Sequence, residues 1–176
     1  MFKAVVMGQT EDRQPVMTIE NLEDTFLSAD GEVTVRVRYA GLNYKDGLCL
    51  NGQGGLIREF PRIPGVEFVG EVLKSRDDRY DVGDQVIATG SRIGEIWHGG
   101  YAEKASVKGE WLVPLPKGMD MRQSMIFGTA GITAVFGLQS LERHGLTPDK
   151  GEVLVTGAAG GVGSFAIALL AALGYS

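Results

Sequence analysis

The chain of 176 residues has only one cysteine, Cys49, and two histidines. A single thiol cannot form an intrachain disulfide, and it cannot supply a cysteine-rich zinc site. Positive charge is also scarce, because 17 Lys and Arg face 22 Asp and Glu and leave a net charge of −5. This balance argues against a nucleic-acid-binding surface. We therefore expect a cytoplasmic protein with no nucleic-acid partner.

Long apolar runs are missing as well. The longest, at 165–173, falls far short of the ~20 residues that a membrane-spanning helix needs. The N-terminal run at 4–7 is too short for a signal peptide. We therefore expect no membrane partner. Hydrophobic residues make up 44% of the chain and charged residues 22%, which is ordinary for a globular protein.

Residues 1–120 have the pattern of a β-rich domain. Short apolar or alternating segments, separated by turn signals, predict strands. These segments lie at 4–7, 33–39, 65–72, 85–89, 101–107 and 111–115. Gly70 lies inside one of them and predicts a bulge or a close backbone contact. Several short strands at regular spacing indicate a barrel or a sandwich.

The pattern changes after Pro116. Asp120 is a predicted N-cap for a helix that begins at Met121. Apolar residues then recur at helical spacing, and Gly128 and Gly131 are expected to divide this stretch into two helices or a helix and a bend. A buried strand at 152–156, a glycine-rich turn and an apolar helix at 164–173 follow.

The turn contains the sequence TGAAGGVG at 156–163. A helix N-terminus offers unpaired N–H groups to a phosphate, and glycine is needed where the backbone must approach it closely. A strand, glycine turn and helix in this order begin a dinucleotide-binding unit. The expected cofactor contacts are Ala159, Gly160, Gly161, Val162 and Gly163. The pattern departs from G-x-G-x-x-G because the first glycine would fall at Ala158, so a purely structural β–α turn remains an alternative.

The same segment also fits T-G-x-x-x-G-x-G, the pattern of short-chain dehydrogenases. Those proteins carry the motif at their N-terminus and use a Tyr-x-x-x-Lys pair downstream. Here about 150 residues precede the motif, and Tyr-x-x-x-Lys does not occur. The order of the segments therefore disfavours that family.

With the β-rich part in front, the chain resembles the medium-chain dehydrogenase/reductase superfamily. The resemblance rests on the order and spacing of GVE at 65–67, GDQV at 83–86, GGYAE at 99–103, GTAGITA at 128–134 and AAGGVG at 158–163. It implies a mixed α/β fold. A GroES-like β-barrel domain at 1–120 would be followed at 121–176 by the first β–α unit of a truncated Rossmann domain.

Zinc alcohol dehydrogenases of this superfamily take ligands from Cys-Gly-x-Asp and Gly-His-Glu segments. By this resemblance Asn43 stands in place of the cysteine and Val66 in place of the histidine. The structural zinc lobe with its four cysteines is missing too. A site with neither thiolate nor imidazole cannot hold a tetrahedral catalytic zinc in the usual way, so we expect no metal. His98 and His144 are isolated and are expected to be surface or internally satisfied histidines.

Within the zinc-independent branch, LNYKD at 42–46, FPRIPG at 60–65 and KGEWL at 108–112 resemble the quinone oxidoreductase group that includes acrylyl-CoA reductase. The resemblance implies reduction of the activated C=C bond of an enoyl thioester, such as acryloyl-CoA, by NADPH. An NADPH:quinone oxidoreductase and a non-catalytic fragment or interaction domain remain alternatives.

The same resemblance implies the site residues. Tyr44 and Asn43 would be catalytic, Tyr44 would also contact the cofactor, and Thr129 and Thr133 would line the nicotinamide pocket. Each has a structural alternative: a half-buried packing tyrosine, a helix cap or turn for Asn43, and threonines bonded to their own helix.

Two neighbours are expected to be structural. Asp46 is interpreted as a local cap or ion-pair partner, and Lys45 as a solvated side chain.

The predicted strand at 152–156 starts only about 25 residues before Ser176, whereas a dinucleotide-binding fold needs several more strands and helices. We therefore expect the chain to stop inside a domain, to expose apolar surface, to bind dinucleotide weakly alone and to form a homo-oligomer. The segment that distinguishes NADPH from NADH would come later, so NADPH follows from the resemblance alone.

Overall fold

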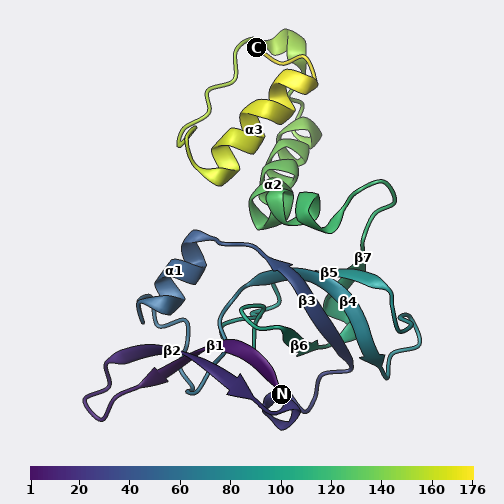
Figure 1. Cartoon of the computed structure of the whole chain (residues 1–176). Helices are drawn as coiled ribbons and strands as arrows, with labels where there is room; N and C mark the ends of the chain where they lie inside the picture. The colour runs from purple at the N-terminus through teal and green to yellow at the C-terminus, as the bar shows by residue number, and fades with distance from the viewer. The chain divides into compact units, whose positions relative to one another are not determined.

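The computed structural model describes residues 1–176 (Figure 1). The chain divides into two compact units, Met1–Ile126 and Phe127–Ser176. The domain division expected at 120 and 121 stays a prediction.

The first unit is built on antiparallel strands. A two-stranded sheet pairs β1 with β2, and a five-stranded sheet has the order β6-β3-β4-β5-β7 (Figure 1). The strands are β1 (Phe2–Gln9), β2 (Pro15–Leu22), β3 (Val33–Ala40), β4 (Glu67–Ser75), β5 (Gln85–Thr89), β6 (Lys104–Val107) and β7 (Leu112–Pro114). Short 3₁₀ turns lie at Asp24–Phe26, Gly109–Trp111 and Pro148–Lys150.

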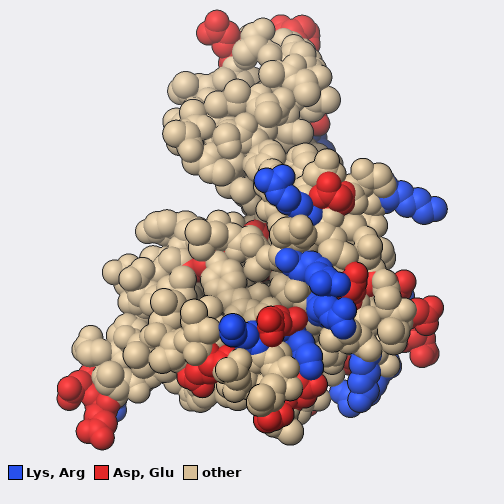
Figure 2. Space-filling view, viewed as in Figure 1, with Lys and Arg blue, Asp and Glu red and all other residues tan.

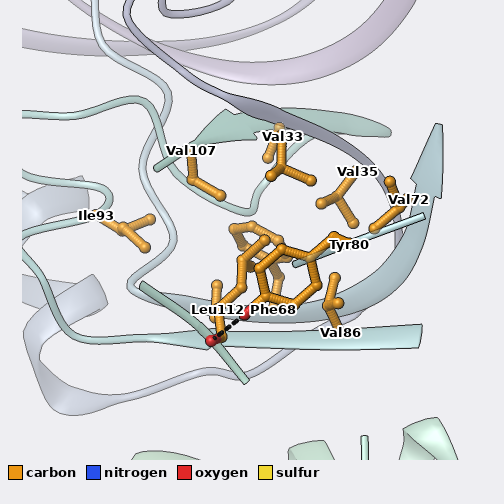
Figure 3. Close-up of a cluster of buried hydrophobic side chains, with 11 residues drawn as sticks. Val33, Val35, Phe68, Val72, Tyr80, Val86, Ile93, Val107 and Leu112 are labelled. Atoms are coloured by element: carbon orange, nitrogen blue, oxygen red, sulfur yellow. Dashed lines mark hydrogen bonds between the residues drawn. The ribbon is translucent and has the colours of Figure 1, made fainter. Parts of the chain in front are cut away.

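The core of this unit lies against one face of the five-stranded sheet. Alternate residues of neighbouring strands, such as Val33 and Val35 on β3, point into it, as the two-residue period of a strand requires (Figure 3). Phe68 from β4 lies among them and is fully buried. The hydroxyl of Tyr80 donates a hydrogen bond to the Leu112 carbonyl at 2.6 Å, so this phenol has a partner inside the core (Figure 3).

Most of the predicted strands form. β5 has the expected limits, and β3 and β4 differ from expectation at their ends. Strand β2 was not predicted, because seven of its eight residues are exposed and its sequence does not alternate cleanly.

Gly70 confirms the expectation of a close backbone contact. A Cβ at this position would overlap the carbonyl oxygen of Arg36 on the neighbouring strand. The register between β3 and β4 shifts beside it, between Val37 and Tyr39. A bulged strand pair leaves no room there for a side chain.

Two helices belong wholly or partly to the first unit, α1 (Tyr44–Leu50) and the start of α2 (Met121–Arg143). Asp120 caps α2 as predicted, because its carboxylate accepts the Gln123 N–H at 2.7 Å while the Gln123 side chain accepts the Asp120 N–H at 3.0 Å. Gly128 has φ 46° and ψ −155° and breaks the helix. The predicted division is therefore confirmed at Gly128, whereas Gly131 is helical.

In the second unit, α3 (Gly161–Ala172) packs beside the later part of α2. The rings of Phe127 and Phe165 stack with centroids 5.2 Å apart. Helix α3 begins three residues earlier than expected. The strand predicted at 152–156 is wrong for this chain, because that segment pairs with no strand and only the Val153 N–H bonds to the Ser176 carbonyl. A strand is defined by its partners.

The second unit exposes apolar side chains, as expected. Leu154 is 89% exposed, and Phe136, Ile167 and Leu173 are also exposed. The face of this unit visible in Figure 2 carries few charged residues. These side chains would need a further layer to be covered.

Helix α2 is long and apolar enough, by length and composition alone, to cross a membrane. This stretch holds no long continuous apolar run, because glycine, threonine and other mildly polar residues interrupt it. Core helices of water-soluble proteins pass the same test, and Gly128 breaks this helix. The absence of a membrane partner stays a prediction.

Candidate functional site

The N-terminus of α1 is fixed to the start of β4 by one buried carboxylate. Asp46 accepts the backbone N–H of Asn43 at 2.8 Å through Oδ2 and that of Val66 at 3.0 Å through Oδ1. Asn43 is the N-cap residue, with extended backbone at φ −117° and ψ 162°. The interpretation of Asp46 as a local cap is confirmed, and its second bond extends that role to a tertiary contact.

The side chain of Asn43 meets a second buried carboxylate. Its amide nitrogen Nδ2 donates to Oε1 of Glu67 at 2.6 Å, and Glu67 is buried. A Cβ at Gly41 would overlap this carboxylate, so the glycine makes room for it. Glu67 was not predicted as a site residue, although a charged residue inside an otherwise apolar strand signals a buried partner.

These contacts bear on the metal question. The positions that supply cysteine and histidine in zinc enzymes carry an amide, Asn43, and an apolar side chain, Val66. The amide nitrogen of Asn43 donates a hydrogen bond to Glu67, whereas a metal ligand must offer an electron pair to the ion. The residues present do not fit a catalytic zinc.

Tyr44 is the first residue of α1 and is 86% exposed. The alternative of a half-buried packing tyrosine is therefore wrong for this structure. Leu42, one residue before the cap, is 80% exposed. The phenol and the neighbouring leucine are thus exposed to solvent beside Asn43, whose backbone bonds to Asp46 and whose side chain bonds to Glu67.

Lys45 is not merely solvated, contrary to expectation. Its Nζ donates to Oε1 of Glu95 at 3.0 Å, and Arg92 approaches the other oxygen of Glu95 at 3.5 Å. The Glu95 side chain is only 7% exposed. Ser91 and Arg92 both have positive φ, 47° and 58°, so this carboxylate lies in a loop of unusual backbone conformation.

Burial sets the acidity of the groups around α1. Desolvation raises the pKa of Asp46 in spite of its backbone hydrogen bonds. Desolvation, with the Asp46 charge, also raises the pKa of the Cys49 thiol to about 11 and the pKa of the Tyr101 phenol. Cys49 is therefore an inert thiol at neutral pH.

The glycine turn of the second unit has the geometry of a phosphate-binding helix start. Gly160 is the N-cap of α3 with extended backbone, and its N–H bonds to the Gly157 carbonyl at 2.9 Å. Gly157 has φ +62°, a conformation that favours glycine. The first turn of α3 thus presents backbone N–H groups.

Close packing inside the turn explains the last glycine. A Cβ at Gly163 would overlap the Gly157 carbonyl, and a Cβ at Gly161 would lie 3.1 Å from Cβ of Ala130. Gly160 and Val162 are exposed, as are Ala159 and Gly161, so the backbone of the turn is accessible. Binding of a pyrophosphate in this accessible cradle stays a prediction.

The two threonines lie on α2. Thr133 donates its hydroxyl to the Thr129 carbonyl at 2.7 Å, so the alternative of a hydroxyl bonded to its own helix describes Thr133. Contact of either threonine with a nicotinamide stays a prediction.

Both histidines have structural surroundings. Nδ1 of His98 accepts the Ile63 N–H at 3.2 Å, and burial lowers its pKa to about 4, with the Arg62 charge adding to this shift. Nδ1 of His144 lies 2.7 Å from the Ser140 carbonyl one helical turn earlier. The expectation of internally satisfied or surface histidines is confirmed.

Comparison with known proteins decides the family. The alcohol dehydrogenase GroES-like domain family matches residues 29–117. Acrylyl-CoA reductase AcuI of Ruegeria pomeroyi is 53% identical over 176 residues, which cover 99% of this chain and 53% of that protein. The chain belongs to the medium-chain dehydrogenase/reductase superfamily. Within this superfamily it belongs to the quinone oxidoreductase family that includes AcuI, YhdH and YhfP.

Solved structures of medium-chain reductases agree with the fold. The YhdH oxidoreductase of Salmonella enterica, crystallised with NADP, has a TM-score of 0.95 and 48% identity over 99% of this chain and 53% of its own. The Bacillus subtilis protein YhfP, crystallised with NAD, has a TM-score of 0.94 and 43% identity over 99% and 53%. The predicted mixed α/β fold with a GroES-like domain is confirmed. The chain spans about half the length of these relatives.

Proposed function

We propose that the complete protein is an NADPH-dependent, zinc-independent reductase of an activated C=C bond, carried by an enoyl thioester such as acryloyl-CoA. The observation that carries this proposal is the turn before α3, where Gly163 packs under the Gly157 carbonyl and leaves the helix N-terminus open to a phosphate. The identity of 53% to an acrylyl-CoA reductase supports the choice of substrate.

In this proposal the residues of the turn hold the cofactor. Residues Ala159, Gly160, Gly161, Val162 and Gly163 would surround the pyrophosphate. Their backbone N–H groups would bind it, except that of Gly160, which already bonds to the Gly157 carbonyl, and the partial positive charge of the helix end would favour it. Thr129 and Thr133 would line the nicotinamide pocket. When bound, the nicotinamide supplies the hydride for the β-carbon of the thioester.

The first unit supplies hydrogen bonds. Negative charge develops on the thioester oxygen during reduction, and a preorganised donor stabilises it. The exposed hydroxyl of Tyr44 is the donor that we propose, because α1 presents it to solvent on a fixed backbone. Asn43 acts beside it at the same helix end. A proton added at the α-carbon completes the reduction.

The decisive experiment measures NADPH oxidation by the complete protein with acryloyl-CoA and, separately, with 1,4-benzoquinone. Faster oxidation with acryloyl-CoA supports the proposal. Turnover of the quinone alone would assign the quinone oxidoreductase activity instead. Lack of turnover with both, together with no NADPH binding by calorimetry, would favour the interaction-domain alternative.

The cofactor preference needs its own measurement. One solved relative was crystallised with NADP and another with NAD. Family membership therefore does not decide between the two cofactors. We propose NADPH. Parallel titrations with NADPH and NADH test this, and tighter binding of NADH would overturn it.

We also propose a cytoplasmic homo-oligomer. The exposed apolar residues of the second unit, among them Phe136 and Ile167, offer surface for covering by another copy or by further chain. Light scattering of the complete protein tests the assembly, and a monomer at all concentrations would contradict it.

A further inference from the structure

We propose that Glu67 is a positioning residue for the reduction, acting through the side-chain amide of Asn43. This inference rests on the proposed function and narrows the expected catalytic role of Asn43 to one of position. It assigns to Glu67 the task of fixing the helix end that presents Tyr44.

The hydrogen bond between the two residues is short and directional. Nδ2 of Asn43 lies 2.6 Å from Oε1 of Glu67. An ionised carboxylate only accepts hydrogen bonds, whereas an amide has a donating and an accepting end. Glu67 therefore determines which end of the amide faces it, and the remaining N–H and the carbonyl oxygen of Asn43 are fixed with it.

The position of the pair makes this orientation consequential. Asn43 is the N-cap of α1, and Tyr44 is the first residue of that helix. Asp46 holds the backbone of the cap, while Glu67 holds its side chain. Both carboxylates are buried, so the cap is fixed at two points by groups that solvent does not reach.

The titratable groups around the pair include Asp46, Cys49 and Tyr101, and the charges of Lys45 and Glu95 also act on Cys49. Asp46 and Cys49 come from α1, and Tyr101 comes from the segment before β6. Burial raises the pKa of the Cys49 thiol and of the Tyr101 phenol, so neither loses a proton near neutral pH. A new titration near neutral pH in a variant of the pair would therefore come from the carboxylates of the pair or of Asp46, and not from the Cys49 thiol or the Tyr101 phenol.

The test exchanges the donor and the acceptor in the complete enzyme. Asn43→Asp places two carboxylates at hydrogen-bond distance, and both cannot be ionised there without repulsion. Glu67→Gln keeps an oxygen that can accept from Asn43. The double variant restores one donor and one acceptor with their direction reversed, because the new glutamine donates to the new aspartate.

We expect kcat/KM of Asn43→Asp with acryloyl-CoA to fall about tenfold, and to fall further as pH rises, because the two carboxylates repel each other once they no longer share a proton. The Glu67→Gln variant should lower kcat/KM about tenfold at both pH values, because a glutamine amide can present either end to Asn43 and no longer determines its orientation. The double variant should recover most of the activity lost at high pH. A double variant as inactive as Asn43→Asp would overturn the inference.

A parallel measurement of the thermal unfolding midpoint against pH separates the two proposals. Wild-type enzyme that reduces neither acryloyl-CoA nor benzoquinone refutes the proposed function, and the inference falls with it. Active wild type whose double variant recovers stability but not activity refutes only the positioning role. Recovery of both supports it.

Discussion

The Nζ atom of Lys45 lies 3.0 Å from Oε1 of Glu95, which joins the first turn of α1 to the loop that follows β5. The lysine side chain is half exposed, whereas the glutamate side chain is almost fully buried. Arg92 reaches the same carboxylate from within the loop. Removing one cation from a buried carboxylate is more destabilising than removing one from a surface ion pair, because the buried charge is left less compensated.

We expect Lys45→Met to lower the free energy of unfolding by about 1 kcal/mol, because Glu95 keeps only Arg92 and Lys45 is partly screened by solvent. Urea unfolding of the complete protein measures this. Lys117→Met is the matched control, since Lys117 is exposed and forms no ion pair. Equal unfolding midpoints for the two variants would contradict a stabilising role for the pair.

Tyr44→Phe should lower kcat for acryloyl-CoA about tenfold in the complete enzyme, because one hydrogen-bond donor to developing charge is removed. KM for NADPH should change little if the ring still contacts the cofactor. Tyr39→Phe serves as the control, because Tyr39 is another partly exposed tyrosine nearby on β3. Unchanged steady-state reduction by the Tyr44 variant would remove its hydroxyl from the mechanism.

Gly163→Ala should destabilise the protein by about 1–3 kcal/mol, because the new methyl group would overlap the Gly157 carbonyl. NADPH affinity measured by calorimetry should fall with it, since the turn must move. Gly137→Ala is the control. A Cβ at Gly137 meets no atom within 4 Å in α2, so this variant should gain about 0.5–1 kcal/mol. Normal cofactor affinity in the Gly163 variant would argue against the proposed cradle.

His98 should make the protein less stable in mild acid. Its pKa is about 4 in the folded chain and about 6.5 in the unfolded chain, so unfolding takes up a proton as pH falls below about 6.5. Between about pH 7.5 and pH 5 this linkage removes at most about 2 kcal/mol. His98→Asn keeps an acceptor for the Ile63 N–H and should flatten this dependence. Chemical denaturation of both proteins at both pH values tests this. An equal change in unfolding free energy with pH for wild type and variant would contradict the burial of a neutral imidazole.

The sequence predicted those elements whose pattern is local. Strand β5 alternates and follows a turn, and Asp120 has a glutamine three residues later, so both could be recognised without tertiary information. The expected break at Gly128 also follows from a local property, because glycine alone tolerates φ 46° with ease.

The elements that were missed depend on distant partners. Helix α1 contains Gly47 and no apolar repeat, and it is held by the contact of Asp46 with Val66, twenty residues away. The bond between Asn43 and Glu67 spans 24 positions. No periodicity reports such a pairing. The prediction of a strand at 152–156 was wrong because a local apolar pattern is not sufficient. The pattern is present, but the segment has no neighbouring strand to pair with.

Strand β2 has a practical consequence. It pairs with β1 on one side only, and Met17 and Ile19 are 55% and 70% exposed. A polypeptide of residues 1–176 would therefore expose an apolar strand edge, at which other molecules can pair during expression and concentration. A lysine at position 17 or 19 would discourage sheet-to-sheet association without touching the core, which makes this hairpin the first place to modify when preparing soluble material.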